Sequence, residues 1–164
     1  MSRYISLLLF IGLAWGQDCT ADDGTEGVEL WGECYSIENT DSLDLSGSWD
    51  NPGELTGSIP PEIGNLTNLT YLSLRSNQLT GTIPPEIGNL TNLINLDLGN
   101  NSLEALRPQI TRLTTLTSLN LSSNNFEGLR PLIGKLRKLP NLTELDLSKN
   151  RLTEFPVPRE SRQN

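Results

Sequence analysis

Leucines alternate with polar residues in five short segments that recur along the chain. These segments are Leu43-Asp-Leu45, Leu72-Ser-Leu74, Leu96-Asp-Leu98, Leu119-Asn-Leu121 and Leu145-Asp-Leu147. A period of two is typical of a β-strand with one buried face. The pattern therefore predicts five short strands whose leucines face a core and whose polar residues face outward.

The segments between these strands repeat as well. Residues 57–69 read Gly-Ser-Ile-Pro-Pro-Glu-Ile-Gly-Asn-Leu-Thr-Asn-Leu, and residues 81–93 repeat them with one change, at an offset of 24 residues. Leucines at L-x-x-L-x-L-x-x-N-x-L with a period of about 20–29 residues are the signature of a leucine-rich repeat. We therefore predict an α/β solenoid of about five repeats, a horseshoe with a short parallel β-sheet on its concave side. The convex side is expected to hold 3-10, irregular or short helical segments.

The repeats are not uniform. The first contains an insert with Trp49, which either covers the end of the core or stands exposed as part of a binding surface. Later repeats shorten by one residue on the convex side, and a basic insert around Arg137-Lys138-Leu139-Pro140 lengthens the fourth. We expect a change of curvature and a basic bulge there.

An asparagine follows each of the last four strand segments: Asn77, Asn101, Asn124 and Asn150. A buried amide is costly unless its polar groups are bonded. We therefore expect these asparagines to bond backbone groups of their own turn and of the adjacent coil, as a structural ladder.

The N-terminal region predicts export. Residues 1–16 read as a signal peptide, with Arg3, a short apolar run and small residues before a cut at Gln17. In an exported protein, Cys19 and Cys34 are expected to form a disulfide. The predicted organisation is a signal peptide (1–16), a disulfide-bonded cap (17–41), leucine-rich repeats (42–156) and a disordered tail (157–164). The mature form is expected to be secreted or at the cell surface, without spanning a membrane.

Composition argues against several functions. The formal charge of −8 gives no long-range attraction for phosphate backbones, so we expect no nucleic-acid partner. The chain has no histidine and no Gly-rich phosphate loop after a strand, and its acidic pairs lack the ligand spacing of an EF-hand. We therefore expect neither an enzyme nor a cofactor or metal site.

The segment 69–84, Leu-Thr-Tyr-Leu-Ser-Leu-Arg-Ser-Asn-Gln-Leu-Thr-Gly-Thr-Ile-Pro, resembles the plant-specific class of leucine-rich repeat. That class is known from ectodomains of plant receptor-like kinases and from polygalacturonase-inhibiting proteins, and similar repeats occur in exported bacterial and protist proteins. The Trp31-Gly-Glu-Cys34 segment is similar to the cysteine-bearing cap that precedes such repeats. The resemblance covers roughly residues 31 to 156 and implies a binding module rather than a catalyst.

Ligands of such a horseshoe are expected on the concave sheet. Strand alternation predicts that its outward face includes Tyr71, Ser73, Arg75, Asn95, Asp97, Asn120 and Asp146. Two interpretations are open. Either these residues are simply those common in such repeats, with short polar side chains that bond to one another across the sheet, or they form a surface that binds a protein or carbohydrate ligand. Tyr71 and Arg75 are the distinctive members, since both residue types are enriched in binding hot spots. Two alternative functions remain. The protein could be a structural or adhesive repeat protein of the cell surface, or even one that binds ice, or it could inhibit glycosidases of the polygalacturonase type.

Overall fold

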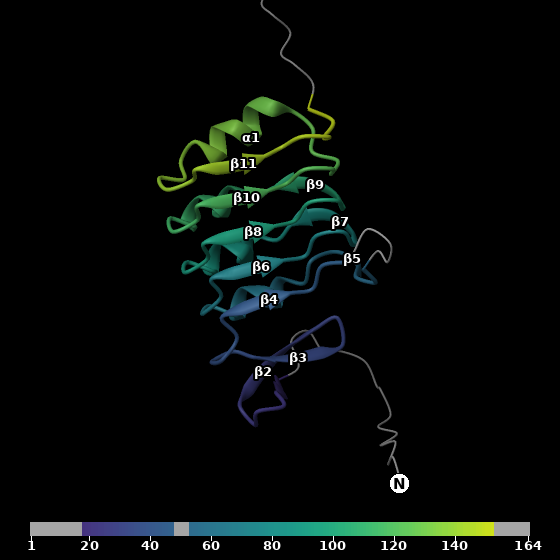
Figure 1. The fold of residues 1–164 in the computed structure, drawn as a ribbon, viewed down its shortest axis with the longest axis vertical. Helices are drawn as coiled ribbons and strands as arrows, with labels where there is room; N and C mark the ends of the chain where they lie inside the picture. Colours follow the sequence, from purple (N-terminus) through teal and green to yellow (C-terminus); the bar gives the residue numbers. More distant parts are fainter. Residues whose placement is uncertain (1–17, 48–52, 153–164) are drawn as a thin grey trace, which may run out of the picture.

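The repeats stack into an elongated solenoid with a small separate sheet at its N-terminal end (Figure 1). The computed structural model describes residues 18–47 and 53–152. The predicted signal peptide, the Trp49 insert and the predicted tail lie outside these ranges. No helix within the ranges is long and apolar enough to cross a membrane.

Five parallel strands form the central sheet: β4 (Ser42–Asp44), β6 (Tyr71–Ser73), β8 (Asn95–Asp97), β10 (Ser118–Asn120) and β11 (Glu144–Asp146). They lie side by side in chain order. Corresponding leucines are in register, so that Leu72 of β6 pairs with Leu96 of β8 and Leu96 pairs with Leu119 of β10. These features confirm the predicted solenoid and its parallel sheet.

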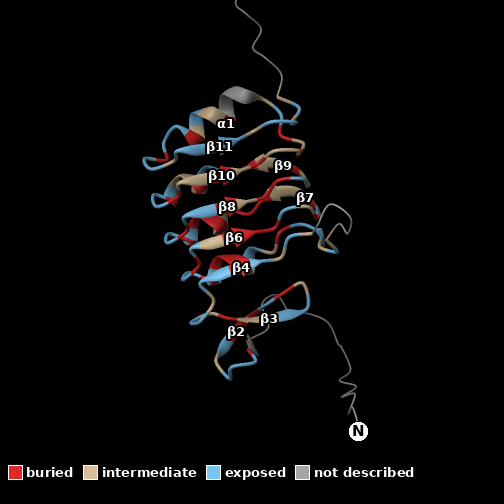
Figure 2. Cartoon of the chain, viewed as in Figure 1, coloured by how far each residue is buried: buried red, intermediate tan, exposed pale blue. Residues whose placement is uncertain are grey.

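The core is a column of leucines and isoleucines enclosed by the turns (Figure 2). The central leucines of β4, β6, β8 and β10 are at most 5% exposed. Leu145 of β11 differs from the expected burial, because it is 40% exposed. No described strand follows β11 in the sheet, so nothing in the described part of the chain covers its far side.

A second parallel sheet, which the sequence pattern did not predict, runs beside the first. It contains β5 (Thr56–Gly57), β7 (Gln78–Ile83) and β9 (Ser102–Leu106). An isolated bridge between Glu127 and Arg151 extends the parallel pairing to later turns. The two sheets flank the same leucine core.

Three short 3-10 helices, η1 (Pro61–Asn65), η2 (Pro85–Asn89) and η3 (Pro108–Arg112), connect the two sheets. Each begins with a proline, whose fixed φ suits the first helical position and whose missing N–H is not needed there. Gly64 and Gly88 are required by close packing: a Cβ would lie 2.6 Å from the Glu86 carbonyl oxygen in the first case and 2.5 Å from the Gln109 carbonyl oxygen in the second. The repeated Ile-Gly-Asn wording therefore lets neighbouring 3-10 helices stack.

The fourth repeat uses an α-helix, α1 (Leu129–Leu136), where earlier repeats use a 3-10 helix. The predicted basic insert begins at the end of α1, with Arg137 as its C-cap residue. Lys135 of the helix donates a hydrogen bond to the Leu106 carbonyl oxygen of the preceding repeat, at 2.5 Å. The extra length of this repeat is thus accommodated by a wider helical turn.

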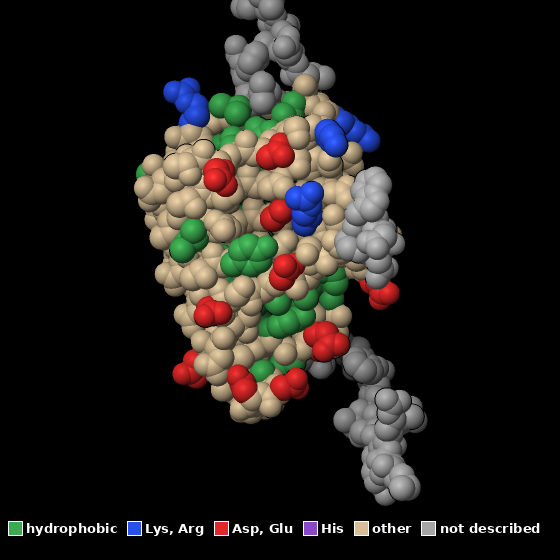
Figure 3. Space-filling model, in the orientation of Figure 1, with side chains coloured by type: hydrophobic (Ala, Val, Ile, Leu, Met, Phe, Trp, Pro, Cys, Tyr) green, Lys and Arg blue, Asp and Glu red, His purple; other side chains and the backbone are tan. Residues whose placement is uncertain are grey.

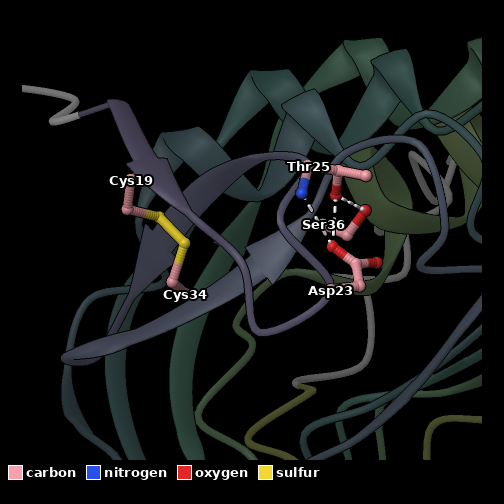
Figure 4. Close-up of a disulfide and its surroundings, with 5 residues drawn as sticks. All are labelled: Cys19, Asp23, Thr25, Cys34 and Ser36. Carbon is pink, nitrogen blue, oxygen red and sulfur yellow. Dashed lines mark hydrogen bonds between the residues drawn. A yellow bond between two sulfur atoms is a disulfide. The ribbon is translucent and has the colours of Figure 1, made fainter.

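The cap is an antiparallel sheet of β1 (Asp18–Thr20), β2 (Glu26–Leu30) and β3 (Glu33–Ser36). Cys19 and Cys34 form the predicted disulfide between β1 and β3 (Figure 4). Val28 and Leu30 of β2 join the core cluster of the repeats. The cap therefore closes the N-terminal end of the solenoid.

A polar cluster holds the turn between β1 and β2 (Figure 4). The Asp23 carboxylate accepts hydrogen bonds from the Thr25 hydroxyl (2.6 Å), the Thr25 N–H (3.0 Å) and the Asn39 amide (2.9 Å). These bonds favour the ionised form, the Thr25 hydroxyl bond most strongly, and lower the pKa of Asp23 to about 2.

Candidate functional site on the concave sheet

The outward residues of the five-stranded sheet form parallel rows across the strands. One row is Ser42, Tyr71, Asn95, Ser118 and Glu144; the next is Asp44, Ser73, Asp97, Asn120 and Asp146. The rows exist because parallel strands in register place equivalent residues side by side. The chain thereby presents a regular polar surface interrupted by a few distinctive side chains.

Tyr71 and Arg75 are the most distinctive of these side chains. Tyr71 lies on β6 at intermediate burial, and Arg75 follows the end of the same strand with its side chain 55% exposed. The Arg75 Nη1 atom lies 3.6 Å from the Asp97 Oδ2 atom of β8, whose side chain is 27% exposed. This distance exceeds that of a hydrogen bond, and exposed ion pairs contribute only about 0–1 kcal/mol. The guanidinium is therefore oriented but only weakly bound.

The aspartates of the second row also stabilise the ends of their own strands. The Asp97 Oδ1 atom accepts a hydrogen bond from the Gly99 N–H at 2.9 Å, and the Asp146 Oδ1 atom accepts one from the Ser148 N–H at 2.8 Å. Hydrogen bonding to Ser148, first from its backbone and then from its side chain, lowers the pKa of Asp146. One oxygen of each carboxylate thus stabilises the fold, and the other oxygen of Asp97 faces the Arg75 guanidinium.

Two positions differ from what alternation alone predicts. Ser73 is only 3% exposed. Its cross-strand neighbours are Asp44 and Asp97, and Tyr71 and Arg75 lie two positions before and after it in the chain, so its short side chain is recessed among longer ones. Ile94 was not predicted as a surface residue but is 45% exposed, immediately before Asn95 of β8.

The four asparagines expected to form a ladder bond the backbone of two successive turns. In Asn101, the Oδ1 atom accepts from the Leu79 N–H at 3.0 Å, and the Nδ2 group donates to the Leu74 carbonyl at 2.9 Å. Asn77, Asn124 and Asn150 repeat the arrangement. Their amides are used up by the fold, so they offer nothing to a ligand.

A second polar ladder was not predicted from the sequence. Three residues before each of β6, β8, β10 and β11, a side chain donates a hydrogen bond of 2.7–3.0 Å to a backbone carbonyl of the preceding turn. The pairs are Asn68 to Glu38, Asn92 to Thr67, Thr115 to Thr91 and Asn141 to Thr114. The repeated sequence Asn-Leu-Thr-Asn-Leu could have predicted this ladder. This ladder lies at the entry to the sheet and fixes the turns on that side.

The charge of the surface is segregated along the solenoid. No Lys or Arg occurs between Arg3 and Arg75. In Figure 3 the lower half, around the cap, shows only acidic charges, and the basic side chains lie in the upper half toward β11. Among the described residues, no group of three or more His, Cys, Asp or Glu is arranged to hold a metal ion.

The family model for the leucine-rich repeat region matches residues 43–155. The chain therefore belongs to the leucine-rich repeat family, as the stacked turns and their asparagines independently indicate. No curated protein matches the chain at a significant level.

Several solved structures are similar to this chain, and plant receptor ectodomains are prominent among them. The ectodomain of the Arabidopsis thaliana receptor kinase GASSHO1/SCHENGEN3, solved with CASPARIAN STRIP INTEGRITY FACTOR 2, is 37% identical with a TM-score of 0.60, over 68% of this chain and 13% of that one. The Arabidopsis HAESA ectodomain, solved with an IDA peptide hormone ligand, is 34% identical with a TM-score of 0.56, over 68% and 18%. A plant ice-binding protein is 33% identical with a TM-score of 0.60, over 68% and 34%.

The chain thus spans between about an eighth and a third of the length of these three relatives. Their repeats and this chain's repeats are of the plant type, which confirms the resemblance found in the sequence.

Proposed function

We propose that this chain is an exported, non-catalytic module that binds a protein ligand, in the form of an extended peptide, on its concave sheet around Tyr71 and Arg75. The observation that carries the proposal is the group formed by Tyr71, the Arg75–Asp97 pair and the exposed Ile94. This group combines an aromatic side chain, a weakly held cation and an apolar side chain, all on or directly beside the neighbouring strands β6 and β8.

The chemistry of the group suits a peptide. A guanidinium presents a planar set of donors that matches a carboxylate or backbone carbonyls. Because its contact with Asp97 is weak, Arg75 can exchange that partner for a ligand group at little cost. Tyr71 and Ile94 offer apolar area near the starting ends of β6 and β8, on one side of Arg75, and aromatic residues are enriched among hot-spot residues at interface centres.

The comparisons support this choice of ligand class over a carbohydrate. The similar HAESA ectodomain was solved with an IDA peptide hormone ligand, and the GASSHO1/SCHENGEN3 ectodomain was solved with CASPARIAN STRIP INTEGRITY FACTOR 2. Export is supported by the disulfide of the cap, because such bonds persist in oxidising compartments. A mature N-terminus at Gln17 in the secreted protein is the result expected from peptide mass mapping.

A structural or adhesive role, including contact with ice, is less well supported. A flat repetitive surface needs the same residue at each turn, but the outward position of the second sheet changes from Thr56 and Thr80 to Glu104. Inhibition of a glycosidase of the polygalacturonase type rests on family resemblance. It predicts loss of activity of a cell-wall hydrolase on addition of the protein, and failure across a panel of such hydrolases removes it.

Selection from a displayed random peptide library, alongside a glycan array, tests the proposal. The purified full chain should enrich related peptides and leave the glycans unbound. Enriched peptides should lose binding to the variant Tyr71→Ala/Arg75→Ala. Binding of glycans without peptides, or of peptides indifferent to the double substitution, would overturn the proposal.

A further inference from the structure

A threonine hydrogen bond recurs at the entry to the central sheet, and one turn departs from it. Directly before β6, β10 and β11, a threonine hydroxyl donates to a backbone carbonyl of the preceding turn: Thr70 to Asp41, Thr117 to Ile94 and Thr143 to Thr117, at 3.0–3.3 Å. Directly before β8 the same position holds Ile94, which is 45% exposed. This turn therefore carries an apolar side chain on the surface where the other three carry a hydroxyl that bonds the fold.

Ile94 lies beside Tyr71 in the outward row that leads from Ser42 to Glu144. The partner of Tyr71 on β8 is Asn95, which directly follows Ile94. An aromatic ring and an aliphatic side chain thus meet on adjacent strands, at the same end of those strands. Such a pair offers apolar area to an apolar side chain of a ligand.

The far end of the same row is acidic. Glu144 ends the row on β11, and Asp146 lies two positions further along that strand, with both side chains exposed. Hydrogen bonds from the backbone and side chain of Ser148 lower the pKa of Asp146 and favour its ionised form. This end of the row therefore attracts a cation.

The single guanidinium at the sheet does not cancel this acidity. The two outward rows contain four carboxylates, those of Asp44, Asp97, Glu144 and Asp146, and the guanidinium of Arg75 already lies 3.6 Å from Asp97. A ligand with net positive charge therefore complements the surface.

The spacing of the strands sets the spacing of the ligand groups. From β6 to β11 there are three strand intervals of about 4.8 Å, or about 14 Å in all. An extended peptide advances about 3.4 Å per residue and turns alternate side chains to the same side. Two side chains four positions apart can therefore reach Tyr71 and Glu144 from one face of a single peptide.

We propose that the ligand of the concave sheet is an extended peptide with an apolar and a basic residue four positions apart. The apolar residue lies against Tyr71 and Ile94, and the basic residue lies beside Glu144 and Asp146. The peptide crosses the strands along the row, and the Arg75 guanidinium donates to its backbone carbonyls. This inference rests on the proposed peptide-binding function and adds the charge and spacing of the ligand.

Synthetic peptide pools, randomised except at two positions, test the inference by fluorescence anisotropy with the full chain. Pools with leucine and arginine four positions apart, in one order or the other, should bind at least tenfold more tightly than matched pools with glutamate in place of arginine. They should also bind at least tenfold more tightly than pools in which leucine and arginine are adjacent. Equal binding of all pools would overturn the inference.

Two variants test the acidic end of the row. Glu144→Gln/Asp146→Asn should abolish the preference for arginine over glutamate, while an amide oxygen can still accept the bond from the Ser148 N–H. Glu104→Gln/Glu127→Gln removes the same charge from exposed residues outside the central sheet and should leave the preference unchanged. An equal loss in both variants would overturn the inference, because overall charge would then explain the preference.

Ile94→Thr tests the apolar end, because it restores the residue that the other turns carry. It should weaken binding of the leucine–arginine pools about tenfold without lowering the melting temperature. Unchanged affinity would overturn the inference.

Failure of the inference and failure of the proposed function give different results. Library peptides that require Tyr71 and Arg75 but share no apolar–basic spacing would overturn the inference and leave the proposed function standing. Absence of binding by every pool and every library peptide would overturn both.

Discussion

At the scale of single residues, the asparagine ladder links each turn to the one before it. The Asn124 Oδ1 atom accepts from the Leu103 N–H at 2.9 Å, and its Nδ2 group donates to the Leu98 carbonyl at 2.9 Å, with the whole side chain buried. Buried backbone groups that lose such a partner cost about 1–3 kcal/mol each. The ladder is therefore a main source of cohesion between turns.

Asn124→Ala should lower the free energy of unfolding by about 3 kcal/mol, because it leaves at least two buried backbone groups without partners. Chemical denaturation of the full chain measures this loss. The neighbouring Asn125, whose side chain makes no hydrogen bond among the described residues, supplies the matched control. Asn125→Ala should be nearly neutral, and an equal loss in both variants would show that the amide bonds are not the cause.

The exposed carboxylate of Asp23 gives the cap a pH dependence. Its pKa is about 2 in the folded protein, below the ordinary value of 3.8. A depressed folded pKa means that the stabilisation is present above the unfolded pKa and is lost as the pH falls from about 4 toward about 2. The melting temperature of the wild type should therefore exceed that of Asp23→Asn at pH 6, and the difference should shrink toward pH 2. A constant difference across this range would contradict the role assigned to ionised Asp23.

At the scale of elements, glycines show which surfaces of the turns are in contact. Gly64 of η1 faces the backbone of η2 at a distance that no Cβ tolerates. Gly134 of α1 is exposed, and a Cβ added there would have nothing within 4 Å. Replacement of glycine by alanine should therefore lower the stability at Gly64 and raise it at Gly134.

Gly64→Ala should destabilise the protein by about 1–3 kcal/mol, because the helices η1 and η2 have to separate. Gly134→Ala should stabilise it by roughly 0.5–1 kcal/mol, since alanine is the better helix residue at an uncrowded position. Thermal unfolding of the two variants measures both effects. A gain in stability from Gly64→Ala would show that the 3-10 helices do not stack as described.

The elements differ in how far the sequence predicts them. The five central strands follow from period-two leucines, but Leu79 and Ile83 of β7 are four residues apart with Gly81 between them, so no strand alternation is visible there. The helix α1 is one of the short helical segments expected on the convex side, but its position was not predicted, because Pro131 and Gly134 discourage a helical reading. Its leucines and isoleucine nonetheless recur at i, i+3, i+4 and i+7, a helical spacing that could have revealed it.

The sequence also predicts the candidate site only in part. Alternation assigns Tyr71 and Arg75 to the outward face, because side-chain direction is a local property of a strand. The burial of Ser73 and the exposure of Ile94 depend on which longer side chains surround them in neighbouring turns. The contact between Arg75 and Asp97 likewise requires the register of β6 with β8, which one sequence pattern does not supply.

At the scale of the whole molecule, each turn contacts only its neighbours, so the ends decide how the stack is maintained. The N-terminal end depends on the cap, where the disulfide joins residues 15 apart in the sequence. Replacing both cysteines, as Cys19→Ser/Cys34→Ser, should reduce the free energy of unfolding by roughly 3 kcal/mol.

Loss of the disulfide should also destabilise the turns next to the cap more than the middle of the stack. Hydrogen exchange should accelerate first at Leu43 of β4, beside the cap, while Leu98 in the middle of the stack remains protected. Uniform acceleration at both amides would indicate that the solenoid unfolds as one unit and that the cap has no separate role.

Binding of an extended peptide on the concave face around Tyr71 and Arg75 can be measured by calorimetry. The full chain is titrated with the tightest peptide from the library selection. Tyr71→Ala/Arg75→Ala should raise Kd at least tenfold, equivalent to about 1.4 kcal/mol, whereas Arg112→Ala, which removes an exposed cation on η3 outside the sheet, should leave Kd unchanged. An unchanged Kd for the double variant would show that the peptide does not bind at Tyr71 and Arg75.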